Sequence, residues 1–230
     1  MIAKDLKNDL LKAIDEVIAP DKKELSEAYV VAPKKFNLNT EKLSPKVKSS
    51  KIKHFESTVE YLNKISVEVD SADTESANPA CGQFRNAKTA ESFLVNDAFL
   101  QGQYLDNISD LNSTISMDML SYIRIARDFG DFDRWQKDFI ACAKSSRNGY
   151  AVLAYSIHLR RYINVVVDEG CVGALFSAIP VIVIDVSQGS YYRDYVDNVE
   201  AYVTSMMKEL NWQVIEERIK KCEKLARAYQ

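Results

Sequence analysis

Three short runs of β-branched and aromatic residues constrain the fold of this chain most. They cover residues 150–157, 162–168 and 180–186, and turn-forming Asp, Glu and Gly residues separate them. Runs of this kind, bounded by such residues, are typical of adjacent antiparallel strands. We therefore expect a small antiparallel sheet set between helices.

Helical patterns occupy most of the remaining chain. Residues 44–66 and 86–106 form two helical stretches, and a further one is expected over about 115–146, with helices again after the third strand. The segment between the first two, residues 67–79, is acidic and rich in turn formers, which favours a solvated loop. The order of elements predicts two long helices followed by a mixed helix and strand region.

Composition sets outer limits on the function. The 230 residues are 47% hydrophobic with only 7 Gly and 5 Pro, as in a compact and mostly helical globule. The net charge of −3 gives no general attraction for polyanions, so any RNA contact would be local. The 4 Cys residues show no Cys-x-x-Cys pair, which predicts reduced structural thiols in a reducing compartment.

The N-terminal segment, residues 1–28, carries an apolar stripe at helical spacing that ends before Pro20. The stripe consists of Leu6, Leu10, Ile14, Val17 and Ile18. It shows neither the apolar core of a signal peptide nor the composition of a transit peptide. Two interpretations stay open: a helix packed on its own domain, or an element that docks on a neighbouring subunit.

Residues 185–195 read Asp-Val-Ser-Gln-Gly-Ser-Tyr-Tyr-Arg-Asp-Tyr. This segment resembles the metal-binding signature of the iron/manganese superoxide dismutases, Asp-Val-Trp-Glu-His-Ala-Tyr-Tyr-x-Asp-Tyr. Residues 54–64, 129–139, 149–153 and 202–218 resemble other stretches of the same family, in the same order and with similar spacing.

The resemblance, which covers about residues 28–220, implies an α+β fold. A helical hairpin domain is expected at residues 29–112, and a C-terminal α/β domain with a three-stranded antiparallel sheet at residues 113–230. Residues 1–28 would be an extension outside the family fold.

Transfer of the family's metal ligands places them on Ser50, Asp97, Asp185 and Gly189, where the family has three His and one Asp. Glycine offers no ligand atom, and two carboxylates with a hydroxyl suit at best a loose site for a hard cation. The resemblance therefore implies a lost metal site, with no cofactor and no catalytic residue.

The resemblance also predicts part of a subunit interface. His54 and Tyr192, which meet across the family's dimer interface, are kept, whereas the family's bridging Glu and His fall on Gln188 and Gly189. An isologous contact loses both copies of a bridge at once. We therefore expect a related but non-identical chain as partner, with a monomer as the alternative.

Four lysines in eight residues lie around the first ligand position: Lys46, Lys48, Lys51 and Lys53. They suit a solvated helix face or, alternatively, a local set of phosphate contacts to ribosomal RNA.

Taken together, these features predict a non-catalytic, superoxide-dismutase-like structural subunit of a large mitochondrial assembly on the matrix side. The first choice is the small subunit of the mitochondrial ribosome. The alternatives are a supernumerary subunit of a respiratory-chain or ATP-synthase complex and, more remotely, a residual metal-dependent enzyme built on Asp97 and Asp185.

Overall fold

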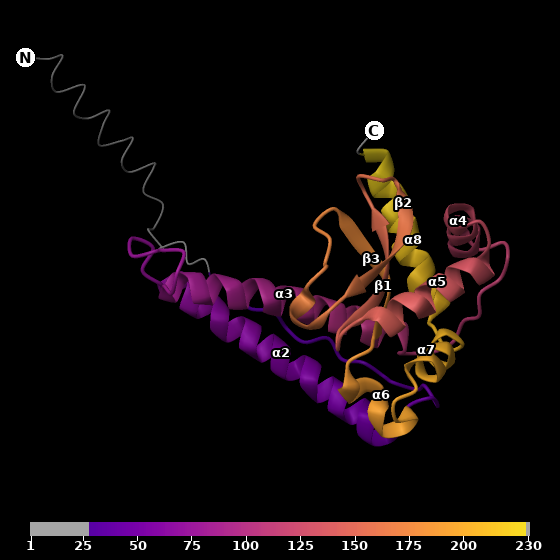
Figure 1. Cartoon of the computed structure of the whole chain (residues 1–230), viewed down its shortest axis with the longest axis horizontal. Coiled ribbons are helices and arrows are strands. Elements are labelled where there is room, and N and C mark those ends of the chain that lie inside the picture. The colour runs from indigo at the N-terminus through magenta and orange to yellow at the C-terminus, as the bar shows by residue number, and fades with distance from the viewer. Residues whose placement is uncertain (1–27, 229–230) are drawn as a thin grey trace, which may run out of the picture.

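The computed structural model describes residues 28–228, which form an elongated pair of helices attached to a mixed α/β body (Figure 1). The predicted helix over residues 1–19 lies outside the described residues. The elements are, in order, α2 (Pro45–Ser71), α3 (Gln83–Asn107), α4 (Leu120–Phe129), α5 (Phe132–Ser145), β1 (Tyr150–Ser156), β2 (Arg161–Val167), the 3-10 turn η1 (Glu169–Cys171), β3 (Ala178–Asp185), α6 (Gln188–Tyr195), α7 (Val199–Met207) and α8 (Trp212–Ala228).

The body is built around a three-stranded sheet of order β2-β1-β3, antiparallel throughout. Strand β1 is buried along its whole length, as expected for a central strand covered on both faces. Helix α5 packs on β1 and β2, whereas α3 and α8 pack on β3. The predicted α+β fold, with a helical hairpin followed by an α/β region, is confirmed.

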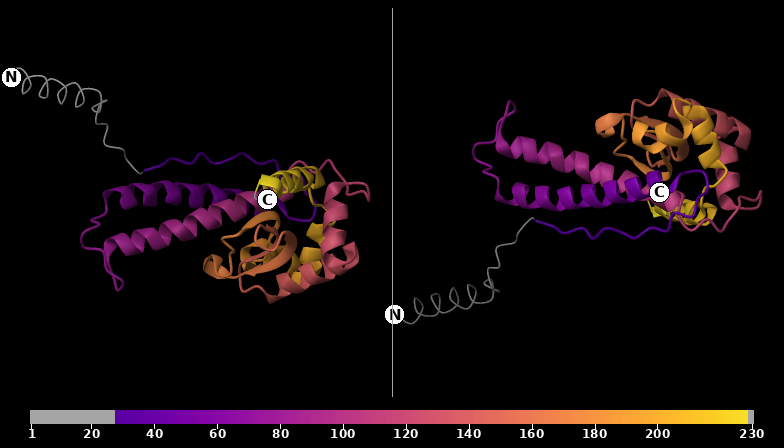
Figure 2. Two further views of the ribbon diagram at one scale, coloured as in Figure 1. Left: turned by 90° about the horizontal axis from the view of Figure 1, so that it is seen from above. Right: turned by 90° about the horizontal axis from the view of Figure 1, so that it is seen from below.

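Helices α2 and α3 form a hairpin whose loop end projects from the body, and the extended residues 28–44 run beside it (Figure 2). Helix α2 begins where Ser44 caps it, since the Ser44 hydroxyl accepts the Val47 N–H at 3.4 Å and proline occupies the first helical position. Its buried face follows helical spacing through Val47, Lys51, Phe55 and Leu62.

The single helix predicted over residues 115–146 is wrong, because the chain breaks it into α4 and α5. Gly130 adopts a φ of +94°, which ends α4 in a conformation that other residues rarely take. The Asp131 carboxylate then accepts the Arg134 N–H at 2.6 Å and starts α5.

Gly149 fixes the position of the residue that follows it. A Cβ at this position would lie 2.1 Å from the Val167 carbonyl oxygen, so only glycine allows the strands to approach so closely. Its own carbonyl accepts the Val186 N–H at 2.8 Å. In this register Tyr150 stands between Val167 of β2 and Asp185 of β3, which brings its ring to the end of the third strand.

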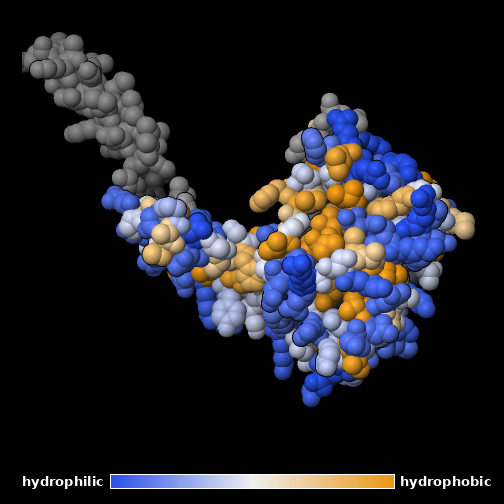
Figure 3. Space-filling view, viewed as in Figure 1, coloured by the Kyte–Doolittle hydropathy of each residue, from blue (hydrophilic) through white to orange (hydrophobic). Residues whose placement is uncertain are grey.

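Within residues 28–228, no helix is both long and apolar enough to cross a membrane. On the face shown in Figure 3, hydrophobic residues gather where the hairpin meets the body, and mostly hydrophilic residues surround them.

Candidate functional site

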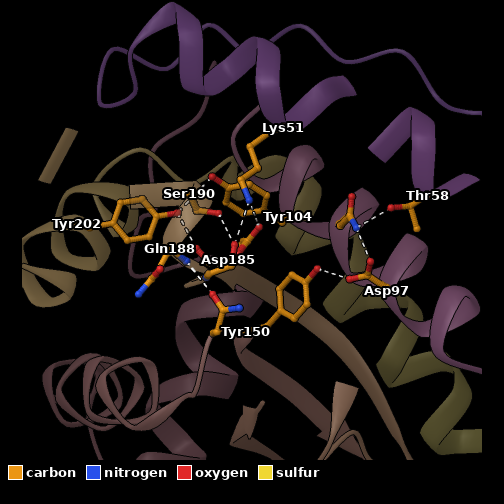
Figure 4. Close-up of polar contacts among 12 residues, drawn as sticks. Lys51, Thr58, Asp97, Tyr104, Tyr150, Asp185, Gln188, Ser190 and Tyr202 are labelled. Carbon is orange, nitrogen blue, oxygen red and sulfur yellow. Dashed lines mark hydrogen bonds and ion pairs between the residues drawn. The ribbon is translucent and has the colours of Figure 1, made fainter. Parts of the chain in front are cut away.

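A pocket of about 330 Å³ lies where the hairpin meets the end of the sheet. It is lined from α2, α3, the start of β1, η1 and the end of β3. Its polar lining residues include His54, Thr58, Asp97, Tyr150, Asp185 and Ser187. Figure 4 shows the polar contacts behind this lining.

A buried ion pair stands at the base of the site. The Lys51 ammonium lies 2.7 Å from Asp185 Oδ2, and the two side chains are only 8% and 3% exposed. The ammonium also donates to Ser187 Oγ at 3.1 Å, and the Ser187 N–H donates to Asp185 Oδ1 at 2.8 Å. Burial alone would raise the pKa of the Asp185 carboxyl, but Lys51 and Ser187 together hold that pKa below its usual value. The Asp185 carboxylate is therefore charged at neutral pH.

The local sequence explains why Asp185 is held so firmly. It is the last residue of β3, and its backbone carbonyl accepts a hydrogen bond from the Tyr202 hydroxyl at 2.8 Å. Ser187 directly follows as the cap residue of α6. A strand end, a helix start and a tyrosine from α7 thus fix the carboxylate against α2.

A second carboxylate, Asp97 of α3, forms the other half of the site (Figure 4). It accepts the Tyr150 hydroxyl at 2.7 Å on Oδ1 and the Gln101 amide at 2.6 Å on Oδ2. The same amide donates to Thr58 Oγ1 at 3.1 Å. Burial, followed by the charges of Asp185 and Asp97, raises the pKa of the Tyr150 phenol far above its usual value. Tyr150 therefore stays protonated and acts only as a donor to Asp97.

The pocket lining carries an excess of negative charge. Four carboxylates line it, namely Asp97, Asp168, Glu169 and Asp185. Lys51 neutralises Asp185, and among residues 28–228 no lysine or arginine lines the pocket. The lining thus keeps three carboxylates without a cationic partner inside the pocket, which favours cations over anions there.

The structure brings Lys51 to Asp185, whereas Ser50, the predicted ligand position, makes no hydrogen bond or ion pair with that carboxylate. Lys51 lies on the buried face of α2, four residues after Val47 and four before Phe55, whereas Ser50 is exposed. The regular spacing of the buried face was the signal that could have identified Lys51. Tyr150 and Gln101 were also missed, since no spacing in the sequence predicts their contacts with α3.

Five of the remaining predicted site residues line a second, separate groove: Lys46, Ser50, Gln188, Gly189 and Tyr192. This groove of about 410 Å³ is lined by Lys46, Val47, Ser50, Gln188, Gly189, Tyr192 and Arg193. Gly189 lies close to the buried ion pair, since a Cβ at this position would lie 3.8 Å from the Lys51 ammonium. Of the pair predicted to meet across an interface, Tyr192 lines this groove and His54 lines the first pocket. Their role at an interface stays a prediction.

The predicted set of phosphate contacts must be corrected at Lys51, because this ammonium is buried against Asp185 and cannot reach a ligand on the surface. Lys48 donates to the Thr40 carbonyl oxygen at 2.9 Å. Lys46 and Lys53 are exposed, and their contact with phosphate stays a prediction.

The residues around Asp185 do not fit an iron or manganese ion. A protonated amine already stands against the carboxylate, Gly189 has no side chain, and both oxygens of Asp97 accept other donors. Among residues 28–228, no group of three or more His, Cys, Asp and Glu side chains could hold a metal ion. Redox metals in proteins prefer imidazole and carboxylate ligands gathered around one point.

Comparison with known proteins finds similarity to one family, strongest in the C-terminal half of the chain. Residues 120–218 match the pattern described as "Iron/manganese superoxide dismutases, C-terminal domain". The chain is 37% identical over 95 residues to superoxide dismutase [Mn] 1 of Halobacterium salinarum, which covers 41% of this chain and 47% of that relative. It is 29% identical over 157 residues to superoxide dismutase [Fe] of Cupriavidus metallidurans (67% of this chain, 77% of the relative). With superoxide dismutase [Fe] of Aquifex pyrophilus the identity is 28% over 174 residues (74% and 81%).

These relatives contradict the predicted function. They are named as superoxide dismutases and hence as enzymes, so the prediction of a non-catalytic subunit of a mitochondrial ribosome, respiratory-chain complex or ATP synthase is wrong. The prediction that the chain is not an enzyme is wrong for the same reason. The fold, the matched C-terminal region and the relatives together support membership of this chain in the iron/manganese superoxide dismutase family.

Proposed function

We propose that this chain binds a small organic cation, such as a protonated primary amine, in the pocket over Asp97. The single observation that carries the proposal is the charge of the lining. Three lining carboxylates lack a cationic partner in the pocket among the residues that the structure describes, while the cation at Asp185 is supplied by the protein itself. A ligand that brings a positive charge would therefore be stabilised, and an anion would be repelled.

Asp97 is the anchor in this proposal. A carboxylate offers about four acceptor positions, and Asp97 uses one on each oxygen, for Tyr150 and for Gln101. It can therefore accept a further N–H from a ligand. Because the Tyr150 hydroxyl and the Gln101 amide fix its orientation, the carboxylate is preorganised and loses little freedom on binding.

Aromatic side chains suit the same ligand. Tyr61, Phe93 and Tyr150 line the pocket, and ring faces attract cations that lie within about 6 Å of their centres. The volume of about 330 Å³ lies at the lower end of the range for small-molecule sites. A compact ammonium ligand with a short apolar tail fits both features.

The test compares three ligands of one size that differ in charge: propylammonium, propanol and propionate. Each is titrated into the full chain, and binding is followed by isothermal calorimetry or NMR shifts. We expect saturable binding of propylammonium alone. Asp97→Asn should weaken it about tenfold or more, since a hydrogen bond to a charged group contributes roughly 1.5–3 kcal/mol. Asp73→Asn, on the exposed loop between α2 and α3, is the matched control and should leave binding unchanged.

Two results would contradict the proposal: propionate binding as tightly as propylammonium, or Asp97→Asn binding like the natural chain. Thermal unfolding of both variants shows whether a loss of binding reflects a loss of folding.

Superoxide dismutation is the second candidate function, because the relatives are named for it. The ion pair at Asp185 argues against it, while the family membership supports it. The purified chain, incubated with iron or manganese and then dialysed, can be assayed for bound metal and for superoxide removal. Activity proportional to about one metal per chain would replace amine binding as the leading proposal.

A further inference from the structure

Another groove, apolar and distinct from the two sites described above, lies on the hairpin. It has a volume of about 460 Å³ and is formed between the extended residues 28–36 and helices α2 and α3. Its apolar lining includes Val31, Phe36, Val59, Leu62, Val95 and Phe99. Val95 and Phe99 are 45% and 49% exposed, which is unusual for large apolar side chains that lie side by side on a helix. Something that covers them would stabilise the hairpin.

The first described residues are fastened directly beside this groove. The Tyr29 N–H donates to Ser66 Oγ at 2.6 Å. The Asn63 side chain makes two bonds with Val31, accepting its N–H at 2.7 Å and donating to its carbonyl oxygen at 2.9 Å. Because Tyr29 and Val31 themselves line the groove, the described part of the chain begins at the edge of the groove.

The length of this segment matches the groove. The apolar stripe of residues 6–18 would span about 18 Å as a helix at 1.5 Å per residue. The part of α3 that lines the groove, Val95 to Asp106, spans about 17 Å by the same measure. Residues 20–27 between stripe and groove can extend by at most about 26–29 Å, enough for the stripe to turn back over α3.

The tether also favours this occupant over a separate molecule. A short flexible linker gives an effective concentration on the order of 1 mM. A partner at micromolar concentration would need about a thousandfold higher affinity to compete equally for the same surface.

We infer that residues 1–19 dock their apolar stripe, Leu6, Leu10, Ile14, Val17 and Ile18, into the groove between residues 28–36 and helices α2 and α3. In this inference the docked segment covers Val95 and Phe99. It acts within its own chain and is independent of the ligand proposed for the pocket over Asp97.

The experiment measures access to the groove in the full chain. Cys81 is exposed, so it is first replaced by serine, and Val95→Cys then places a reporter thiol in the groove. The rate of its modification by a thiol reagent is compared with and without Leu10→Asp/Ile14→Asp, which places two charges on the stripe. Asn8→Asp/Lys12→Asp, with the same spacing on the opposite face of the predicted helix, is the matched control.

If the stripe docks in the groove with a Kd near 0.1 mM, the Val95→Cys reporter should react on the order of tenfold more slowly with the natural stripe than with the Leu10→Asp/Ile14→Asp stripe. The control pair should keep the slow rate. Equal rates of thiol modification in all three proteins would overturn the inference and favour binding of the stripe to a neighbouring protein. Protection that rises with protein concentration, together with a dimer mass in light scattering, would overturn it in favour of a second copy of the chain.

Discussion

Replacement of Lys51 by methionine tests the role of the buried ion pair. Methionine keeps the unbranched apolar stem of lysine and removes its charge, which leaves Asp185 with the Ser187 N–H but without its cation. Removing one partner of a buried pair costs about 3–5 kcal/mol, because the remaining charge stays in a low-dielectric interior. With side chains 8% and 3% exposed, this pair belongs to that class. We therefore expect a loss of about 3–5 kcal/mol in the free energy of unfolding at pH 7.

The loss should depend on pH in a defined direction. In the natural chain the folded pKa of Asp185 is depressed, so its contribution is present above the unfolded pKa and is lost as the pH falls through the folded pKa. In Lys51→Met, burial is no longer opposed by the ammonium, and the pKa of Asp185 rises. The variant can then protonate Asp185 in mild acid, and the difference between the two proteins should shrink from pH 7 to pH 5.

The assay is urea unfolding at both pH values. Lys64→Met is the matched control, since Lys64 also lies on α2 and also meets a carboxylate at 2.7 Å, that of Glu60, but with both side chains at least 60% exposed. Such surface pairs contribute little. A Lys51→Met variant no less stable than Lys64→Met, or one whose deficit does not change with pH, would refute the reasoning.

Two further predictions concern the body. Glu216 accepts the Ser121 N–H at 2.8 Å at the start of α4, and its pKa is lowered despite partial burial. Glu216→Gln should therefore lower the free energy of unfolding by about 1–2 kcal/mol at pH 7 and by less in acid, where the natural chain loses this contribution. Urea unfolding at pH 3.5 and 7 measures the difference. Gly149→Ala should lower the free energy of unfolding by at least about 2 kcal/mol, because its Cβ would lie 2.1 Å from the Val167 carbonyl oxygen. In Gly102→Ala, the control, the nearest atom to the new Cβ lies at 3.5 Å, so this variant should keep its melting temperature in thermal unfolding. Equal melting temperatures for the two alanine variants would contradict the packing argument.

The strands and the helical hairpin could be predicted because their signals are local. Runs of Val, Ile and Tyr marked β1, β2 and β3 to within about two residues. The break between α4 and α5 was missed although Gly130-Asp131 is a common sequence for a helix end followed by a cap. Resemblance supplied the order of the elements, which periodicity alone does not determine.

The site was harder to predict because its contacts are distant in sequence. Asp97 and Asp185 were found, but counting back along α2 placed Ser50 where the buried face places Lys51. The contact of Tyr150 with Asp97 joins residues 53 positions apart and depends on how β1 enters the sheet beside Gly149. The functional prediction failed for another reason: it inferred a missing activity from missing ligands, while the relatives are named as enzymes.

The most direct test of the site is a crystal structure of the chain after soaking with both manganese and propylammonium, with diffraction recorded at the manganese absorption edge. Our account predicts the Lys51 ammonium at Asp185, propylammonium density against Asp97 and no anomalous peak between the two carboxylates. An anomalous peak bound to Asp185, with Lys51 displaced from it, would contradict the account.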